Sequence, residues 1–179
     1  MLVPNNKQCT RLFQFAGTAR YAYNWAIAEV KGNYESDKKF LSDCELRKRF
    51  TRLKQEPKNS WLYTISNNVT KQAIKDAVNA YQRFFKGLVN FPRYKSRKHS
   101  LAKFYVDPVK IKFTRTHVKL ESIALSKRKN RQIANWLRLE EHDLVPVNAN
   151  LSSKHGINVL ALQIYAFPWK FNNKFPAFP

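Results

Sequence analysis

The sequence predicts an α+β fold in which a helical bundle is followed by a small antiparallel β-sheet or incomplete β-barrel. Over the first half of the chain, apolar residues recur every three or four positions, which is the period of an amphipathic helix. From Lys103 to Leu125 they alternate with polar residues, which is the period of half-buried strands. With 44% hydrophobic residues and only four glycines among 179 residues, the chain can bury a core.

The first helix is expected from residue 6 to about residue 31. Its apolar stripe consists of Leu12, Phe15, Ala19, Ala22, Ala26 and Val30. Glycine costs a helix about 1 kcal/mol, so two helices joined by a tight turn at Gly17 are the alternative.

Two further helices are predicted by their capping residues. Ser42 and Glu45 have the spacing of a capping box, which indicates a helix ending near Gln55. Residues 56–65 are expected to form a loop. Ser66 then caps a third helix that ends near Gly87, and its stripe should lie on the first helix. That stripe consists of Val69, Ala73, Ala77, Ala80, Tyr81, Phe84 and Phe85.

The sheet is expected between about residues 92 and 145. Its inward-facing pairs are Phe104/Val106, Ile111/Phe113 and Val118/Leu120, with turns near residues 107–108 and 115–117. Pro92 should favour an extended backbone at the switch from helix to strand. There, Phe91 would pack back onto the helices, while Arg93 and Lys95 would point outward to phosphate.

The charge of the chain indicates a polyanionic partner. The formal net charge is +21, from 33 basic and 12 acidic residues. Such a chain attracts nucleic acid by counterion release. No apolar stretch is long enough to span a bilayer and the N-terminus lacks the pattern of a signal peptide. We therefore expect a cytoplasmic protein without a membrane partner. Cys9 and Cys44 are expected to be buried free thiols.

No catalytic or metal-binding constellation is evident. The acids are scattered, the four histidines form no metal-binding pattern, and no glycine-rich phosphate loop is present. The sequence does contain residues suited to binding nucleic acid. Cationic side chains can neutralise phosphates, and aromatic rings can stack on unpaired bases. Tyr94, Phe104 and Tyr105 offer such rings. The predicted nucleic-acid-binding residues are Asn67, Lys71, Lys75, Arg93, Tyr94, Lys95, Arg97, Lys98, Lys103 and Arg115.

Several ordered motifs between residue 4 and about residue 148 resemble the N-terminal half of the TnpB (OrfB-type) proteins of insertion sequences. They are Gly17-Thr18-Ala19-Arg20, Tyr23-Asn24-Trp25, Trp61-Leu62, Ala80-Tyr81-Gln82-Arg83-Phe84-Phe85, Phe91-Pro92-Arg93-Tyr94-Lys95, Lys127-Arg128-Lys129-Asn130-Arg131 and Arg138-Leu139-Glu140-Glu141-His142. Each motif is weak alone, and together they are specific.

The resemblance implies an RNA-guided DNA nuclease that is encoded beside a transposase. In that family a helical recognition domain of the helix-turn-helix type is inserted after the first strand of a wedge-like β-barrel. Residues 1–4 would then be a remnant of the first strand, 5–90 the recognition helices and 91–148 the wedge-like domain. Residues 149–179 would be a divergent or disordered tail. By position, Asn67 and Lys71 would face the DNA motif, and residues 93–98 the RNA–DNA assembly.

The family's nuclease part, with three separated acids, a divalent metal and a four-cysteine zinc motif, has no counterpart in the sequence. We therefore expect a fragment that binds guide RNA and double-stranded DNA without cutting, located at the nucleoid of a bacterium or archaeon. Its link to the element's separate transposase would be indirect. No cofactor is expected in this chain. Two alternatives remain open: a guide-dependent repressor, and a generic RNA- or DNA-binding protein.

Overall fold

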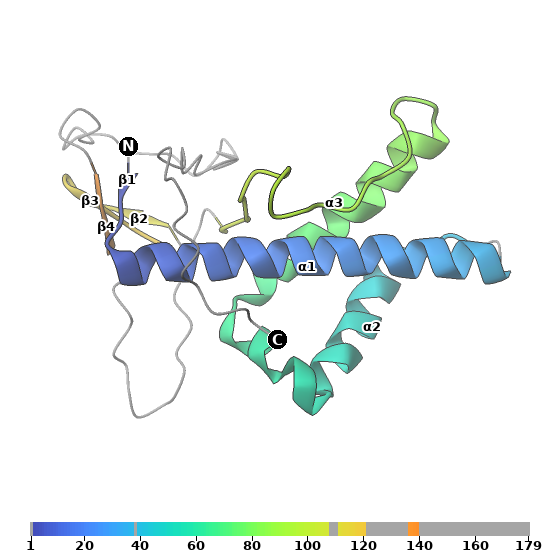
Figure 1. Ribbon diagram of the computed structural model, residues 1–179, viewed down its shortest axis with the longest axis horizontal. Helices are drawn as coiled ribbons and strands as arrows, with labels where there is room; N and C mark the ends of the chain where they lie inside the picture. The colour runs from blue at the N-terminus through green and yellow to red at the C-terminus, as the bar shows by residue number, and fades with distance from the viewer. Residues whose placement is uncertain (1, 38, 108–110, 121–135, 140–179) are drawn as a thin grey trace.

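Figure 1 shows a computed structural model of the chain, in which residues 2–37, 39–107, 111–120 and 136–139 are described. In chain order the elements are β1 Leu2–Val3, α1 Asn6–Asp37, α2 Asp43–Gln55, the 3-10 helix η1 Pro57–Thr64, α3 Asn67–Phe85, β2 Lys112–Phe113, β3 His117–Lys119 and β4 Trp136–Leu139. The helical part of the predicted fold is confirmed. No helix in the described ranges combines the length and the apolar character that crossing a bilayer requires.

Helix α1 is one continuous helix of 32 residues, so the alternative with a turn at Gly17 is wrong. Apart from the backbone of α1 itself, no described atom lies within 4 Å of the position of a Cβ at Gly17, so close packing against other parts of the chain does not require glycine there. The helix also continues beyond the expected end near residue 31. An exposed ion pair between Lys31 and Glu35, with 3.8 Å between Nζ and Oε1, links successive turns of this extension.

The predicted helix caps are confirmed. Ser42 Oγ accepts from the backbone N–H of Glu45, and the Glu45 carboxylate accepts from the backbone N–H of Ser42. The backbone N–H of Ser42, together with the Ser42 hydroxyl that donates to Glu45 Oε2 at 2.7 Å, lowers the pKa of Glu45. Ser66 caps α3 by accepting from the backbone N–H of Asn68. Gly87 has a φ of 71°, and bonds from Gly87 N–H to Phe84 and from Leu88 N–H to Arg83 complete a Schellman ending.

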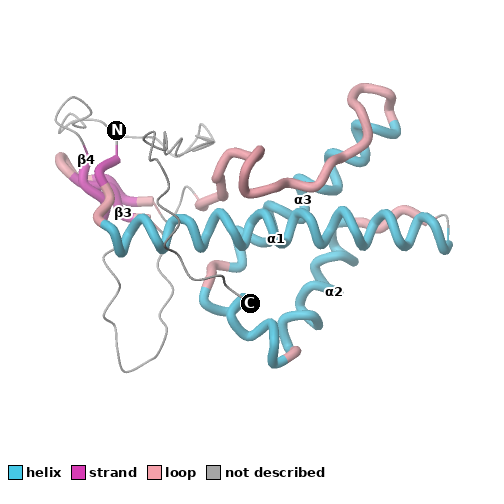
Figure 2. Tube along the Cα trace, viewed as in Figure 1, coloured by secondary structure: helices cyan, strands magenta, loops and turns pink. Residues whose placement is uncertain are grey.

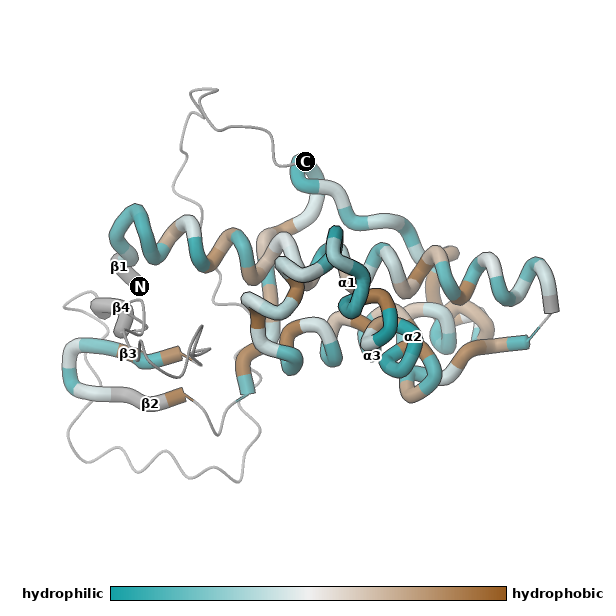
Figure 3. The backbone as a smooth tube through the Cα atoms, turned by 90° about the horizontal axis from the view of Figure 1, so that it is seen from below, coloured by the Kyte–Doolittle hydropathy of each residue, from teal (hydrophilic) through white to brown (hydrophobic). Residues whose placement is uncertain are grey.

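The core lies mainly between α1 and α3, whose buried hydrophobic residues belong to one cluster. Figure 3 shows hydrophobic residues recurring along both helices. All six expected α1 positions are buried, whereas Phe85 of the α3 stripe is 50% exposed. Ala22, Ala26 and Ala77 have no exposed surface, which lets the two helix backbones approach closely. The expected loop over residues 56–65 is instead η1, which begins with Pro57 and inserts the fully buried Leu62 into this core.

The four described strands form one antiparallel sheet in the order β1-β4-β3-β2. Leu2 pairs with Leu139, Val118 with Leu137, and Phe113 with Val118. The hairpin turn expected near residues 115–117 is present. A closed barrel finds no support in the described residues. The two edges, β1 and β2, have no further neighbour among them.

The strand predicted at Phe104 and Val106 is wrong, because residues 101–107 belong to no strand. Phe104 instead packs on Phe15 of α1, with 5.1 Å between ring centroids. Phe104 also borders the small cluster of Leu12, Val118 and Leu120 through which the sheet rests on α1. The alternation in this segment therefore reflects packing against a helix rather than strand pairing.

The expectation of two buried thiols is also wrong. Cys44 is exposed on α2 and Cys9 is partly exposed near the start of α1. The Lys127–Arg131 motif and residues 140–179, which include the expected tail, lie outside the described residues.

The tight approach of α1 and α3 predicts that Ala26 cannot be enlarged. Ala26→Leu should lower the free energy of unfolding by about 1–3 kcal/mol, because extra methyl groups in a packed core force the helices apart. Ala28→Leu is the matched control, since Ala28 is exposed two positions along the same helix. Urea denaturation measures both. Equal stability of the two variants would contradict the packing described.

Candidate nucleic-acid interface

The segment after α3 runs back along the helices toward the sheet, and it is shown in pink in Figure 2. Pro92 is buried at its start. Phe91 lies edge-on to Tyr81 and Phe84, with ring centroids 5.6 and 5.3 Å apart. The predicted packing of Phe91 onto the helices is thus confirmed, and it begins the docking of this segment.

Asn24 of α1 fixes the middle of the segment through two hydrogen bonds. Its Nδ2 donates to the backbone carbonyl of Lys95 at 2.9 Å, and its Oδ1 accepts from the backbone N–H of Lys95 at 2.8 Å. An asparagine amide can satisfy both backbone groups of one residue in this way. The side chain therefore acts as a short piece of strand that holds residue 95 against the helix.

The sequence predicted that the Lys95 side chain points outward to phosphate, and the structure shows that this prediction is wrong. Its Nζ lies 3.5 Å from the ring centroid of Tyr23, in a cation–π contact. Burial and the nearby charge of Lys103 lower the pKa of Lys95, and Asp76 opposes this shift. Burial raises the pKa of Tyr23. Lys95 is thus a half-buried cation placed by α1.

The following residues form a compact turn that displays cations. Ser96 Oγ accepts from His99 N–H at 3.0 Å, and Ser100 N–H donates to the Ser96 carbonyl at 3.1 Å. The same turn is closed by Ser96 N–H donating to Ser100 Oγ at 3.1 Å. Arg97 and Lys98 lie at its exposed tip. Arg93 and Tyr94, just before Lys95, are also exposed, so all four are accessible to a ligand.

The sequence predicted a polar face on α3, and the structure confirms that this face is exposed. Asn67, Lys71 and Lys75 all lie on the solvent side of the helix. Asn67 is oriented by Lys54 of α2, whose Nζ donates to Asn67 Oδ1. Lys54 is only 5% exposed and lies over the rings of Phe50 and Tyr63 at 5.4 and 5.8 Å. This bond orients the Asn67 amide, whose Nδ2 can donate to a ligand.

The remaining predicted residues separate into two places. Lys103 lies near Lys95, and both line one cavity together with Arg20 of α1. Arg115 is exposed in the turn between β2 and β3, so it belongs to the sheet rather than to α3. Phe104, considered as a stacking platform, is instead engaged by Phe15.

Two contributing residues were not identified from the sequence as binding groups. Asn24 was noted only within a family motif, and Lys54 carried no signal, because nothing in the sequence shows that a lysine in the last turn of α2 is buried. No group of three or more His, Cys, Asp or Glu side chains that could hold a metal occurs in the part of the chain that is described. The arrangement offers binding groups: exposed cations, amide donors and an exposed tyrosine ring.

Removing the Asn24 amide should loosen the basic segment. Asn24→Ala should cost about 1–2 kcal/mol of stability, because two hydrogen bonds are lost and backbone groups of Lys95 are left unpaired. Asn24→Asp keeps only the acceptor and should be intermediate. Hydrogen exchange at residues 93–98 measures the effect. Unchanged exchange in Asn24→Ala would show that other contacts hold the segment.

Lys54→Met separates stability from recognition. Burial lowers the pKa of Lys54, so at neutral pH its charge subtracts from folding stability. The apolar replacement should therefore leave the melting temperature unchanged or raise it. If Asn67 reads a base, losing its orienting partner should weaken discrimination by about 1–3 kcal/mol. Calorimetry and competition binding with changed DNA sequences check the two effects. A large loss of stability would contradict this account of Lys54.

Comparison with known proteins identifies relatives of the chain. Residues 1–39 match the model of a helix-turn-helix domain of the OrfB type from IS605 elements. These residues contain β1 and all of the described α1, whereas α2 begins only at Asp43.

Three curated proteins are also similar. InsQ of Escherichia coli (strain K12), named as an RNA-guided DNA endonuclease, is 27% identical over 76% of this chain and 34% of its own length. A Streptomyces pristinaespiralis protein with the same type of name is 27% identical over 55% of this chain and 25% of its own length. A625R of Paramecium bursaria Chlorella virus 1, named as a transposase, is 30% identical over 55% of this chain and 25% of its own length.

The chain thus spans about a third or less of the length of these relatives. The helix-turn-helix match and the similarity to these proteins confirm the resemblance to TnpB/OrfB-type proteins of insertion sequences that was noted in the sequence.

Proposed function

We propose that this chain binds guide RNA and the double-stranded DNA beside a target, as the N-terminal part of a TnpB-like RNA-guided DNA endonuclease. The observation that carries the proposal is the basic segment over residues 93–98, which Asn24 of α1 holds at Lys95 while Arg93, Arg97 and Lys98 stay exposed. The net charge of +21 supports a polyanionic partner.

The two surfaces suit different contacts. Arg93, Arg97 and Lys98 are exposed cations on a loop, which suits phosphates regardless of sequence. Asn67 and Lys71 lie one turn apart on a rigid helix, which suits donors that read base edges in a groove. The oriented amide donor of Asn67 favours a specific role for α3.

The domain boundaries predicted from the sequence belong to this proposal. The β1–β4 pairing supports them, because the helices lie in the chain between one strand and the rest of the same sheet. Residues 1–4 would supply a strand to the wedge-like domain of residues 91–148. The recognition helices would occupy residues 5–90, and residues 149–179 would form a separate tail.

We further propose that the 179-residue chain binds without cutting. Sequencing RNA that co-purifies with it tests the guided function directly. One defined RNA species would support a guide, while a broad mixture would favour the generic binder. Repression of a gene at a site that the chain occupies without cleavage would favour the guide-dependent repressor. Magnesium-dependent DNA cleavage by the purified chain, absent from a mock purification, would overturn the non-cutting assignment.

Two single substitutions should have different effects on DNA binding. Lys71→Ala should weaken binding to one short DNA motif by about 1–3 kcal/mol and relax the choice of base there. Arg97→Ala should weaken binding to all sequences alike and reduce the slope of log affinity against log salt by about 1.

Competition binding against a randomised DNA library, at several salt concentrations, measures both changes. Lys86→Ala is a suitable control, because Lys86 is an exposed lysine at the opposite end of α3 from Asn67. Equal, sequence-independent losses from Lys71→Ala and Arg97→Ala would contradict the division between the two surfaces.

A further inference from the structure

A cavity of about 280 Å³ lies between α1, α3 and the segment over residues 100–105. Small side chains from both helices line it, including Ala16, Ala19 and Ala73. Tyr105 contributes an aromatic ring. Small apolar groups together with an aromatic ring make a space suited to a flat, partly apolar ligand.

The same cavity is lined by charged groups of both signs. Arg20, Lys95 and Lys103 supply cations, and Asp76 of α3 supplies the acid. Gln72 Nε2 donates to Asp76 Oδ1 at 2.8 Å, which holds this carboxylate in place on the helix. The carboxylate of Asp76 and the side-chain oxygen of Gln72 can accept hydrogen bonds from a ligand. The cavity thus presents acceptors on α3, with cations on α1 and the basic segment.

We propose that this cavity takes one unstacked nucleobase together with a neighbouring phosphate of the bound strand. The inference rests on the proposed nucleic-acid function and adds a specific subsite to it. The N–H groups of the base would donate to Asp76 and Gln72, its flat face would lie against the alanines and Tyr105, and the phosphate would meet Arg20 and Lys103.

The acid argues against a site for a bare anion. A carboxylate repels phosphate but accepts hydrogen bonds from a base edge, so its presence beside three cations suits a nucleotide better than phosphate alone. Bases in a closed duplex are stacked and cannot enter such a space, whereas single strands and loops offer unstacked bases.

Three single-stranded probes of equal charge test the subsite on the full chain. They are an adenine RNA and an adenine DNA, each about ten nucleotides long, and a DNA of the same length without bases. Base contact in the cavity should make the base-containing strands bind about tenfold tighter than the abasic strand. The RNA and DNA arms show which sugar the site accepts.

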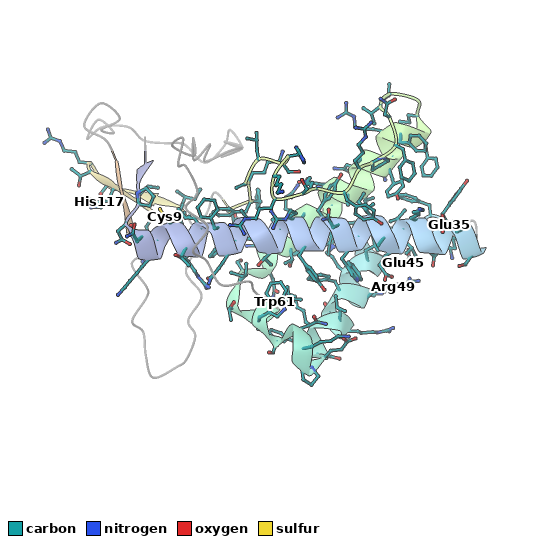
Figure 4. The ribbon with its side chains drawn as sticks, in the orientation of Figure 1. Cys9, Glu35, Glu45, Arg49, Trp61 and His117 are labelled. Atoms are coloured by element: carbon teal, nitrogen blue, oxygen red, sulfur yellow. The ribbon has the colours of Figure 1, made fainter. Side chains whose placement is uncertain are left out.

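Asp76→Ala gives the sharpest result, because charge alone and base recognition predict opposite signs. Removing an acid should tighten binding to any polyanion. If Asp76 accepts from a base, Asp76→Ala should instead weaken binding to the adenine strands about five- to tenfold while the abasic strand binds at least as well. Glu35→Ala is the matched control with the same change in charge, at the C-terminal end of α1 (Figure 4).

The outcomes distinguish a failure of the subsite from a failure of the proposed function. If Asp76→Ala tightens binding to all three probes, as Glu35→Ala should, the subsite is overturned while nucleic-acid binding stands. The same holds if the wild-type chain binds abasic and adenine strands equally. If the chain, shown to be folded by circular dichroism, binds none of the probes at moderate salt, the subsite and the proposed function both fail.

Discussion

The two hydrogen bonds between Asn24 and the backbone of Lys95 are the contact on which the proposed nucleic-acid-binding surface depends. Residues 88–107 contain no helix or strand, so no ladder fixes their path. The Asn24 amide supplies what a neighbouring strand would supply, at one residue. On either side, Phe91 and Phe104 pack on the helices through aromatic contacts. Three anchors therefore give an irregular basic segment a defined place along α1 and α3.

The basic residues of this chain repel one another in the folded state. With a net charge of +21, each exposed Lys or Arg raises the electrostatic cost of the folded state. Lys54 is buried and Lys95 is half-buried, and each lies over an aromatic ring, so the positions of their charges are set by the fold. A bound polyanion would relieve the repulsion among the exposed cations. Affinity for nucleic acid and stability of the chain are therefore expected to be coupled.

Much of the helical architecture could be predicted from the sequence, because the signals are local. The period of the α1 stripe, the Ser42–Glu45 capping box and the glycine at the end of α3 each act within a few residues. The strand at Phe104 could not be excluded in this way, because alternation looks the same whether the inward residues meet a sheet or a helix. Lys54 bonds to Asn67, which is 13 positions away in the sequence. Lys95 bonds to Asn24, which is 71 positions away. Contacts of that kind become visible only when the helices are placed in space.

The central claim is that nucleic acid binds along α3 and the anchored basic segment. Hydrogen exchange of the full chain with and without a saturating RNA or DNA ligand tests this most directly, because it reports where the backbone is shielded. The account predicts added protection over residues 93–105 and along residues 67–79, with little change at the Lys31–Asp37 end of α1. Protection confined to α2 or to that end, with residues 93–105 unchanged under full occupancy, would contradict it.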